Sequence, residues 1–134
     1  MIQRAAAIVI KEGKILLMHR KKTDAEYYAI SGGHIENGES PEITATRELK
    51  EETSLDAEID FFFLENENNG WHNYFYMAKN IKGEARFGGE ELERNCAENQ
   101  YELEWVELLK LPEVNLLPVE VKQKLIETFC KKSF

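Results

Sequence analysis

GHIENGESPEITATRELKEETSL, residues 33–55, is the stretch in which the local structural signals of the chain are strongest. Within it, Ser40 offers a hydroxyl as a helix N-cap, and Pro41 suits the first helical position, where its fixed φ fits and its missing N–H is not needed. We therefore predict a helix from Pro41 to about Thr53. The Ser-Gly-Gly sequence at residues 31–33 has two glycines, which permit backbone angles that other residues resist, so we predict a sharp loop of close approach.

The predicted helix carries a cluster of carboxylates. Glu48, Glu51 and Glu52 are spaced i, i+3 and i+4, so they project from one face. Like charges at this spacing repel by roughly a few tenths of a kcal/mol per pair, and a hard divalent cation with oxygen ligands would reverse that sign. Arg47 can pair with Glu51 at i+4. The alternative is a solvated acidic helix face with no site, because glutamate-rich surface helices are common.

The same stretch resembles the signature of the Nudix hydrolases. The family pattern is Gly, five residues, Glu, seven residues, Arg-Glu, an aliphatic residue, any residue, Glu-Glu, any residue, Gly and an aliphatic residue. The positions that match this pattern are Gly33, Glu39, Arg47, Glu48, Leu49, Glu51, Glu52 and Leu55. The one departure inside it is Ser54, where the family has glycine. Upstream, Tyr28 and Ser31 stand where the family often has Trp and Pro, and Ser31 lacks the rigid ring of proline.

The resemblance implies a metal site. By analogy with the family, Glu51 and Glu52 would be the leading metal ligands, and Glu48 would be another ligand or the base that activates water. The carbonyl of Gly32 would complete an oxygen cage for Mg²⁺ or Mn²⁺. Such an ion would offset the negative charge of a phosphoanhydride and promote attack by water at phosphorus.

Other residues acquire supporting roles from the same resemblance. Arg47 would orient the glutamates, and Glu39 would brace the loop against the helix. In some family members the general base or an extra ligand comes from a distant carboxylate, for which Glu98, Glu102 and Glu104 are the candidates here. Each of these three could equally be an exposed position near a strand, and the sequence does not choose among them.

Three further residues are candidates for contact with substrate. Arg20 lies on the predicted N-terminal hairpin, where family members often hold phosphate or base, although a solvated strand arginine is the default. Tyr28 keeps the aromatic character of the family's Trp position, and His34 lies in the motif loop. The histidines are too scattered in the sequence to propose a zinc site.

Composition narrows the classes of function. Asp and Glu number 25 against 17 Lys and Arg, a formal charge of −8, so duplex nucleic acid is not an expected partner. No apolar run approaches the roughly 20 residues that cross a bilayer, and charged residues interrupt the N-terminal apolar stretch before a signal sequence develops. We expect one cytoplasmic domain over residues 1–134, not inserted in a membrane, with Cys96 and Cys130 reduced.

The order of predicted elements indicates the fold class. Hydrophobic periodicity and turn residues indicate where each expected element begins and ends. They are a hairpin of residues 4–10 and 14–19 turning at 12–13, a short strand at 27–30, the helix, a second hairpin of 59–64 and 71–78 turning at Asn69-Gly70, a mobile loop within 80–100, a strand at 101–106, and a helix from Pro118 to Cys130. We predict an α/β or α+β fold in which a mixed sheet packs between helices.

These expectations converge on a hydrolase for a nucleoside diphosphate linked to another group. A nucleoside triphosphate pyrophosphohydrolase of the MutT type is the first expectation, because the chain is small. The alternatives are an ADP-ribose or sugar-nucleotide pyrophosphatase, and a Nudix-fold sensor that binds nucleotides without turnover. The expected partner is a small nucleotide-type substrate, and the sequence leaves monomer or homodimer open.

Overall fold

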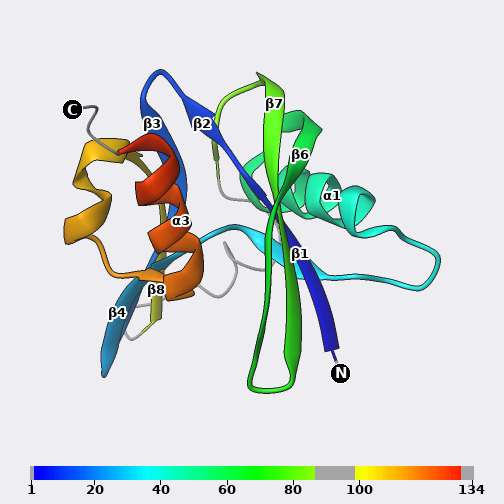
Figure 1. Cartoon of the computed structure of the whole chain (residues 1–134), viewed down its shortest axis with the longest axis horizontal. Coiled ribbons are helices and arrows are strands. Elements are labelled where there is room, and N and C mark those ends of the chain that lie inside the picture. Colours follow the sequence, from blue (N-terminus) through cyan, green and yellow to red (C-terminus); the bar gives the residue numbers. More distant parts are fainter. Residues whose placement is uncertain (1, 87–98, 131–134) are drawn as a thin grey trace.

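The computed structural model describes residues 2–86 and 99–130 of the chain. Its strands form two sheets, and helices lie on both sides of them (Figure 1). In chain order they are β1 (Ile2–Ile8), β2 (Ile10–Lys11), β3 (Lys14–Lys22), β4 (Ala25–Ala29), β5 (Gly32–His34), α1 (Pro41–Thr53), β6 (Asp56–Asn68), β7 (Trp71–Lys82), β8 (Asn99–Glu107), the 3₁₀ helix η1 (Leu108–Glu113), β9 (Leu116–Leu117) and α3 (Val119–Phe129).

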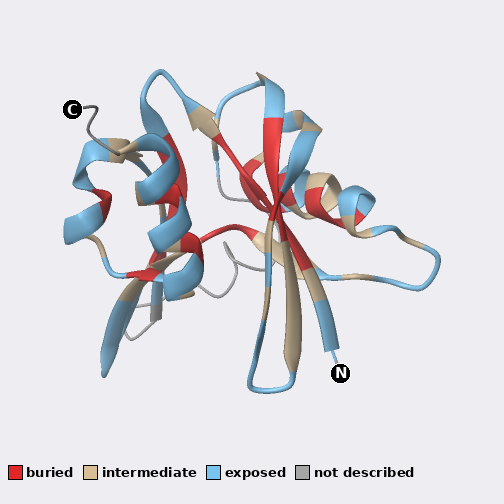
Figure 2. Ribbon diagram, in the orientation of Figure 1, coloured by how far each residue is buried: buried red, intermediate tan, exposed pale blue. Residues whose placement is uncertain are grey.

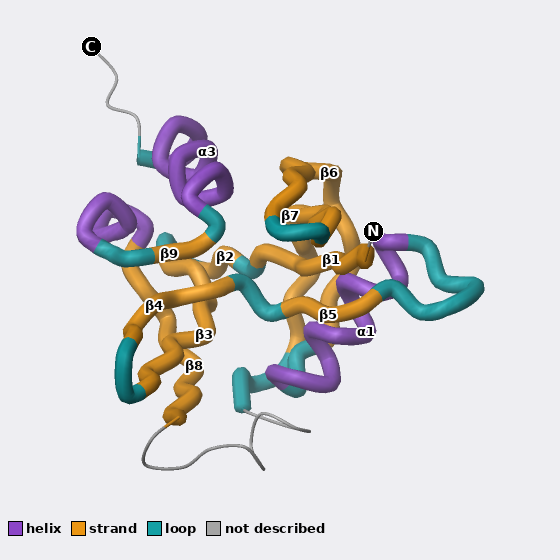
Figure 3. Tube along the Cα trace, turned by 90° about the horizontal axis from the view of Figure 1, so that it is seen from below, coloured by secondary structure: helices purple, strands orange, loops and turns teal. Residues whose placement is uncertain are grey.

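Both sheets are mixed. The first has the strand order β5-β1-β7-β6, in which β1 runs parallel to β7 and antiparallel to β5. The second has the order β2-β3-β4-β9, and β8 pairs with β3 outside that path. Figure 3 shows α1 and α3 on opposite sides of the strands. The predicted mixed sheet between helices is confirmed.

The first strand explains why helices cover both sides. Successive residues of a strand point to opposite faces, and in β1 both faces are buried from residue 5 to residue 8. Ala5 belongs to the same core as Leu49 of α1, whereas Ile8 belongs to the same core as Leu125 of α3. Figure 2 shows the buried residues concentrated where β1 crosses β7 and along the inner faces of the helices.

The motif helix forms as predicted, from Pro41 to Thr53. The Ser40 side chain accepts a hydrogen bond from the backbone N–H of Ile43 at 3.2 Å. At the other end, Ser54 adopts φ 68 and its N–H bonds the carbonyl of Lys50. This left-handed cap is the conformation for which glycine is preferred, so the serine at this position keeps the backbone geometry at a conformational cost.

The predicted N-terminal hairpin is wrong for most of its length. The turn at residues 12–13 exists, but only Ile10 and Lys11 pair with β3. The preceding residues, β1, pair instead with β5 and β7. The physical reason is the burial of both faces of β1, which requires a central position in a sheet. The long β3 makes its main hairpin with β4, a pairing that the sequence did not predict.

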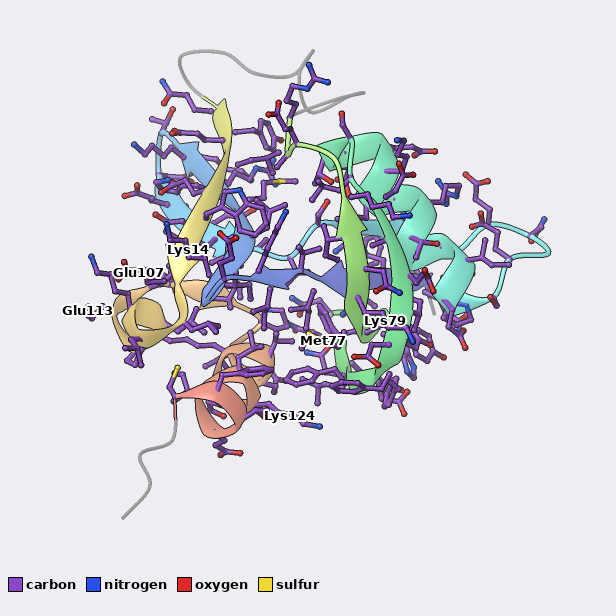
Figure 4. The ribbon with its side chains drawn as sticks, turned by 90° about the horizontal axis from the view of Figure 1, so that it is seen from above. Lys14, Met77, Lys79, Glu107, Glu113 and Lys124 are labelled. Carbon is purple, nitrogen blue, oxygen red and sulfur yellow. The ribbon has the colours of Figure 1, made fainter. Side chains whose placement is uncertain are left out.

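The remaining predictions fare better. The hairpin of β6 and β7 closes at Asn69-Gly70, and both strands are longer than predicted. Residues 32–34 of the expected loop form β5. Lys124 of α3 lies over the Phe63 ring of β6 at 4.8 Å, which ties the last helix to that hairpin (Figure 4).

Two observations concern the wider expectations. Within residues 2–86 and 99–130, no helix is long and apolar enough to cross a membrane. Cys130 is half-buried, its thiol contacts the carbonyl of Leu108, and burial raises the pKa of that thiol. Cys96 lies outside the described residues.

Candidate active site

Two glycines place the motif loop directly against its neighbours. A Cβ atom on Gly33 would lie 2.3 Å from the carboxyl carbon of Glu48, so only glycine lets β5 pass this close to the helix carboxylate. A Cβ on Gly32 would lie 2.6 Å from the carbonyl oxygen of Ala5 in β1. The predicted close approach is therefore present, and it fixes the loop between α1 and the central strand.

Arg47 connects the loop to the carboxylates of α1. Its Nε donates to Glu39 Oε2 at 2.6 Å and its Nη2 to Glu39 Oε1 at 3.0 Å, a bidentate pair. Its Nη1 donates to Glu48 and Glu51, at 3.1 Å to Oε1 of each. Its Nη2 also donates to the backbone carbonyl of His34 at 3.2 Å. The guanidinium thus forms the expected pair with Glu51, contacts Glu48 and Glu39 as well, and holds the end of β5.

The electrostatic consequence is clearest at Glu39. Hydrogen bonds from Arg47 and from the Thr44 hydroxyl, with the backbone N–H of Glu36, lower the pKa of Glu39 to about 2. The same pairing raises the pKa of Arg47 above its usual value. The pair is therefore charged at any pH near neutrality. Glu39 lies where the sequence predicted a brace between loop and helix.

Glu52 is held differently from the other glutamates of the helix. It is buried, with 5% of its surface exposed, and its Oε1 accepts a 2.7 Å hydrogen bond from the Ser31 hydroxyl. Sequence reasoning treated Ser31 only as the loss of a proline ring. The structure instead gives this serine a contact that orients a buried carboxylate, and the signal that pointed to it was its departure from the family pattern.

The donor atoms of this region fit a hard cation. Three carboxylates and the Gly32 carbonyl are oxygen donors, which Mg²⁺ and Mn²⁺ prefer. Here the Gly32 carbonyl accepts a hydrogen bond from Arg4 at 3.1 Å, Glu51 pairs with Arg47, and Glu52 pairs with Ser31. Sharing one ion would require some of these donors to exchange their present partners.

A cavity of about 610 Å³ adjoins the motif. Gly32 and Glu52 border it, and both sheets and the start of α3 contribute to its wall. Its charged and aromatic lining consists of Arg4, Arg20, Tyr27, Trp71, Tyr74, Phe75, Tyr101, Glu52 and Glu120. This volume lies within the range of roughly 300–1,000 Å³ that is usual for small-molecule sites.

Arg20, one of the predicted substrate contacts, lies in this cavity. Its Nη1 donates to the Tyr27 hydroxyl at 2.9 Å, and its guanidinium lies 4.7 Å from the centre of the Tyr101 ring. Its Nε is buried without a hydrogen-bond partner among the described residues. Arg20 therefore places a positive charge between two aromatic rings on the wall of the cavity.

The other two predicted contacts lie elsewhere. Neighbouring residues of a strand face opposite sides, so Tyr27 lines the cavity while Tyr28 lies on the far face of β4, stacked on His19 at 4.1 Å. Tyr27 replaces Tyr28 as the candidate from this strand. His34 stacks on Trp71 at 5.1 Å, so it supports the cavity wall through that ring.

The candidate distal carboxylates also lie away from the motif. Glu98 lies outside the described residues. Glu102 and Glu104 lie on the face of β8 opposite to Tyr101, and Glu104 contacts His19 and Tyr28. Of the described residues, only His19, Glu102 and Glu104 bring three metal-ligand atoms within 4.8 Å of one another. The structure does not bring these two glutamates to the motif helix.

The sequence did not predict which residues come together on the cavity wall. Arg4 and Trp71 lie side by side because β1 runs parallel to β7. The Arg4 Cζ atom is 5.5 Å from the centre of the Trp71 ring. Tyr27 and Tyr101 flank Arg20 because both are its cross-strand partners, in β4 and β8. The hairpin of β3 and β4 was the one pairing here with a local sequence signal, the polar turn at Thr23-Asp24.

Comparison with known proteins agrees with this fold and loop-helix unit. A model of the NUDIX domain matches residues 1–128. The chain belongs to the Nudix family and is a Nudix hydrolase. Members of the family are generally pyrophosphatases that act on nucleoside diphosphate derivatives and generally use divalent metal ions. A search of curated proteins gave no significant match.

Solved structures share the fold over nearly the whole chain. The E. coli ORF135 protein is 26% identical with a TM-score of 0.71, covering 97% of this chain and 89% of that chain. A MutT from work on Aliivibrio salmonicida and Vibrio cholerae is 20% identical with a TM-score of 0.75, covering 96% and 98%. The MutT Nudix hydrolase from Burkholderia pseudomallei is 23% identical with a TM-score of 0.71, covering 93% and 97%.

Proposed function

We propose that this Nudix hydrolase cleaves a nucleoside triphosphate into a nucleoside monophosphate and pyrophosphate, using Mg²⁺ or Mn²⁺ held by the motif. The observation that carries the proposal is the cavity of about 610 Å³, which has Glu52 and Gly32 on its border and arginines and aromatic rings on its wall. A base can stack on such rings, and guanidinium groups pair with phosphate oxygens.

The motif residues divide the work of the reaction. Glu51 and Glu52 would hold the ion, with the Gly32 carbonyl, and Glu48 would be a further ligand or the base that takes a proton from water. When bound, the ion offsets the negative charge of the phosphates and makes water a better nucleophile. Arg47 keeps the carboxylates in register through its contacts to Glu48 and Glu51.

The charged walls of the cavity support binding of phosphates in a protein that is acidic overall. Arg4 contributes a guanidinium beside Gly32, and Arg20 contributes one farther along, next to Tyr101. The same cavity extends from these groups to Glu52, the one motif glutamate of the helix that lines it. We infer that the phosphates lie toward Arg4 and the motif, with the base toward Tyr101.

The test is a substrate panel with Mg²⁺ or Mn²⁺. Ribo- and deoxyribonucleoside triphosphates, ADP-ribose and sugar nucleotides are compared by the products released. We expect a triphosphate to give the highest kcat/KM, and Glu51→Gln and Glu52→Gln each to lower it at least about 100-fold, the scale typical for the loss of one catalytic group. Glu127→Gln, an exposed glutamate of α3, is the matched control and should leave turnover unchanged.

Three results would overturn the proposal. Faster cleavage of ADP-ribose or a sugar nucleotide would move the substrate to that class. Tight, metal-dependent nucleotide binding with no turnover of any member would identify a sensor. If divalent ions neither bind the protein nor raise its melting temperature, the glutamates form only a solvated helix face.

A further inference from the structure

A second group of metal-ligating side chains lies on the far side of the strands that line the cavity. His19 of β3 is the cross-strand partner of Glu102 in β8, and Glu104 lies two residues farther along the same face. One ligand atom from each of the three lies within 4.8 Å of the other two. His19 is almost completely buried, with 8% of its surface exposed. Two paired strands therefore present a nitrogen and two carboxylates to one point.

Both ring nitrogens of His19 face carboxylate oxygens, and a neutral ring can donate to only one of them. Its Nε2 lies 2.7 Å from Glu26 Oε2, and its Nδ1 contacts Glu104 Oε2. A neutral imidazole carries a single N–H. If that hydrogen points from Nε2 to Glu26, then Nδ1 and the Glu104 oxygen face each other with lone pairs. Either a second proton must lie between them, or the two groups must move apart slightly and share a cation.

The charges around His19 favour a cation that carries more than one positive charge. The groups that face it are the carboxylates of Glu26, Glu102 and Glu104 and the hydroxyl of Tyr28, which donates to Glu104 Oε2 at 3.4 Å. The one basic side chain paired with these carboxylates among the described residues is Lys21, whose Nζ is 4.0 Å from Glu26 Oε2. A proton on the imidazole would leave three carboxylates against one positive ring, whereas a divalent ion would balance two of them directly.

Tyr28 belongs to the same cluster. Its phenol donates a hydrogen bond to Glu104 Oε2. It fixes the orientation of that carboxylate and supplies no positive charge of its own.

We propose that His19 Nδ1 and the carboxylates of Glu102 and Glu104 bind a divalent transition-metal ion, with Zn²⁺ as the reference ion, at a site separate from the motif glutamates. A mixed set of imidazole nitrogen and carboxylate oxygen suits Zn²⁺ better than Mg²⁺. Glu26 would then be the carboxylate that accepts the other ring N–H, an arrangement that fixes the tautomer of most metal-bound histidines. The ion would join β3 to β8 on the side away from the cavity.

The experiment measures Zn²⁺ alone on the full chain after treatment with a chelator. Calorimetry with metal analysis of the dialysed protein gives stoichiometry and affinity. We expect Glu102→Gln to weaken the site at least 10-fold, and Glu26→Gln to weaken it by about 10- to 100-fold as the loss of a supporting carboxylate does elsewhere. Millimolar Mg²⁺ should not displace the ion.

Two controls separate this site from others. Glu107→Gln alters the same strand on its opposite face, where Glu107 pairs across from Lys14 (Figure 4), and should leave Zn²⁺ affinity unchanged. The double variant Glu51→Gln/Glu52→Gln should retain Zn²⁺ at this site. Circular dichroism and melting curves establish that each variant is folded before its affinity is compared.

The outcomes are distinct. If Zn²⁺ binding is lost with Glu51→Gln/Glu52→Gln and kept with Glu102→Gln, the ion occupies the motif and the proposal is wrong. If the folded wild-type protein binds no Zn²⁺ with micromolar or better affinity at pH 7.5 to 8, there is no metal site and the proposal is wrong. Failure of nucleotide turnover would overturn the proposed function and leave this result unaffected.

Discussion

Replacing Gly33 with alanine tests the close approach of β5 to the motif helix. The added Cβ would lie 2.3 to 2.6 Å from the three atoms of the Glu48 carboxyl group, whereas ordinary contacts begin near 3.4 Å. The carboxyl group must therefore withdraw by about 1 Å, and a misplacement of about 1 Å in a positioned catalytic group costs on the order of 100-fold in rate. Because a side-chain end can move, we expect the free energy of unfolding to change by less than about 1 kcal/mol.

The assay compares kcat/KM on the best nucleotide of the panel with urea unfolding of the same sample. Gly32→Ala is the matched control, since its Cβ would meet the Ala5 carbonyl oxygen and the Ala6 Cβ at 2.6 Å in the central strand. Strand atoms cannot withdraw as a side-chain end can, so we expect this variant to lose about 1–3 kcal/mol of stability. A Gly33→Ala protein that turns over at the wild-type rate would refute the reasoning, as would one destabilised as much as Gly32→Ala.

Three other predictions follow from the loop-helix unit. Ser31→Ala removes the hydroxyl that donates to buried Glu52. It should lower the free energy of unfolding in urea by about 1–3 kcal/mol and should also lower kcat. If neither quantity changes, Ser31 does not position Glu52. Ser54→Gly relieves a left-handed backbone and should raise the free energy of unfolding by up to about 1 kcal/mol, and a lower melting temperature would contradict this. The pKa of Glu39 falls from 4.5 to about 2 on folding. Its pairing with Arg47 therefore stabilises the folded protein fully above about pH 4.5, and this stabilisation is lost as the pH falls toward 2. Glu39→Gln should make the free energy of unfolding less dependent on pH in this range, as measured by urea unfolding between pH 2 and 7.

The motif helix was predictable because its signals are local. Ser40 and Pro41 set its start, and the spacing of the glutamates sets its charged face, all within one short stretch. The contact of Arg47 with Glu51 also follows from that stretch. A hydrogen-bonded cap and an i, i+4 pair depend on residues within a few positions of each other, so no knowledge of distant strands is needed.

The walls of the cavity were not predictable in the same way. Choosing Tyr28 over Tyr27 was an error of one residue, and one residue decides which face of a strand a side chain takes. The same alternation carries Glu102 and Glu104 away from the motif. The parallel pairing of residues 2–8 with residues 71–77 leaves no local mark, because parallel strands are joined by long connections and not by a turn.

That long-range pairing of β1 has a consequence for how the protein is made. A ribosome releases β1 early and β7 only after some sixty further residues, and pairings this distant in sequence form slowly because a large loop must first be closed. The motif helix needs no such partner to begin winding. The part of the cavity wall where Arg4 meets Trp71, by contrast, becomes complete only when the second half of the chain has arrived.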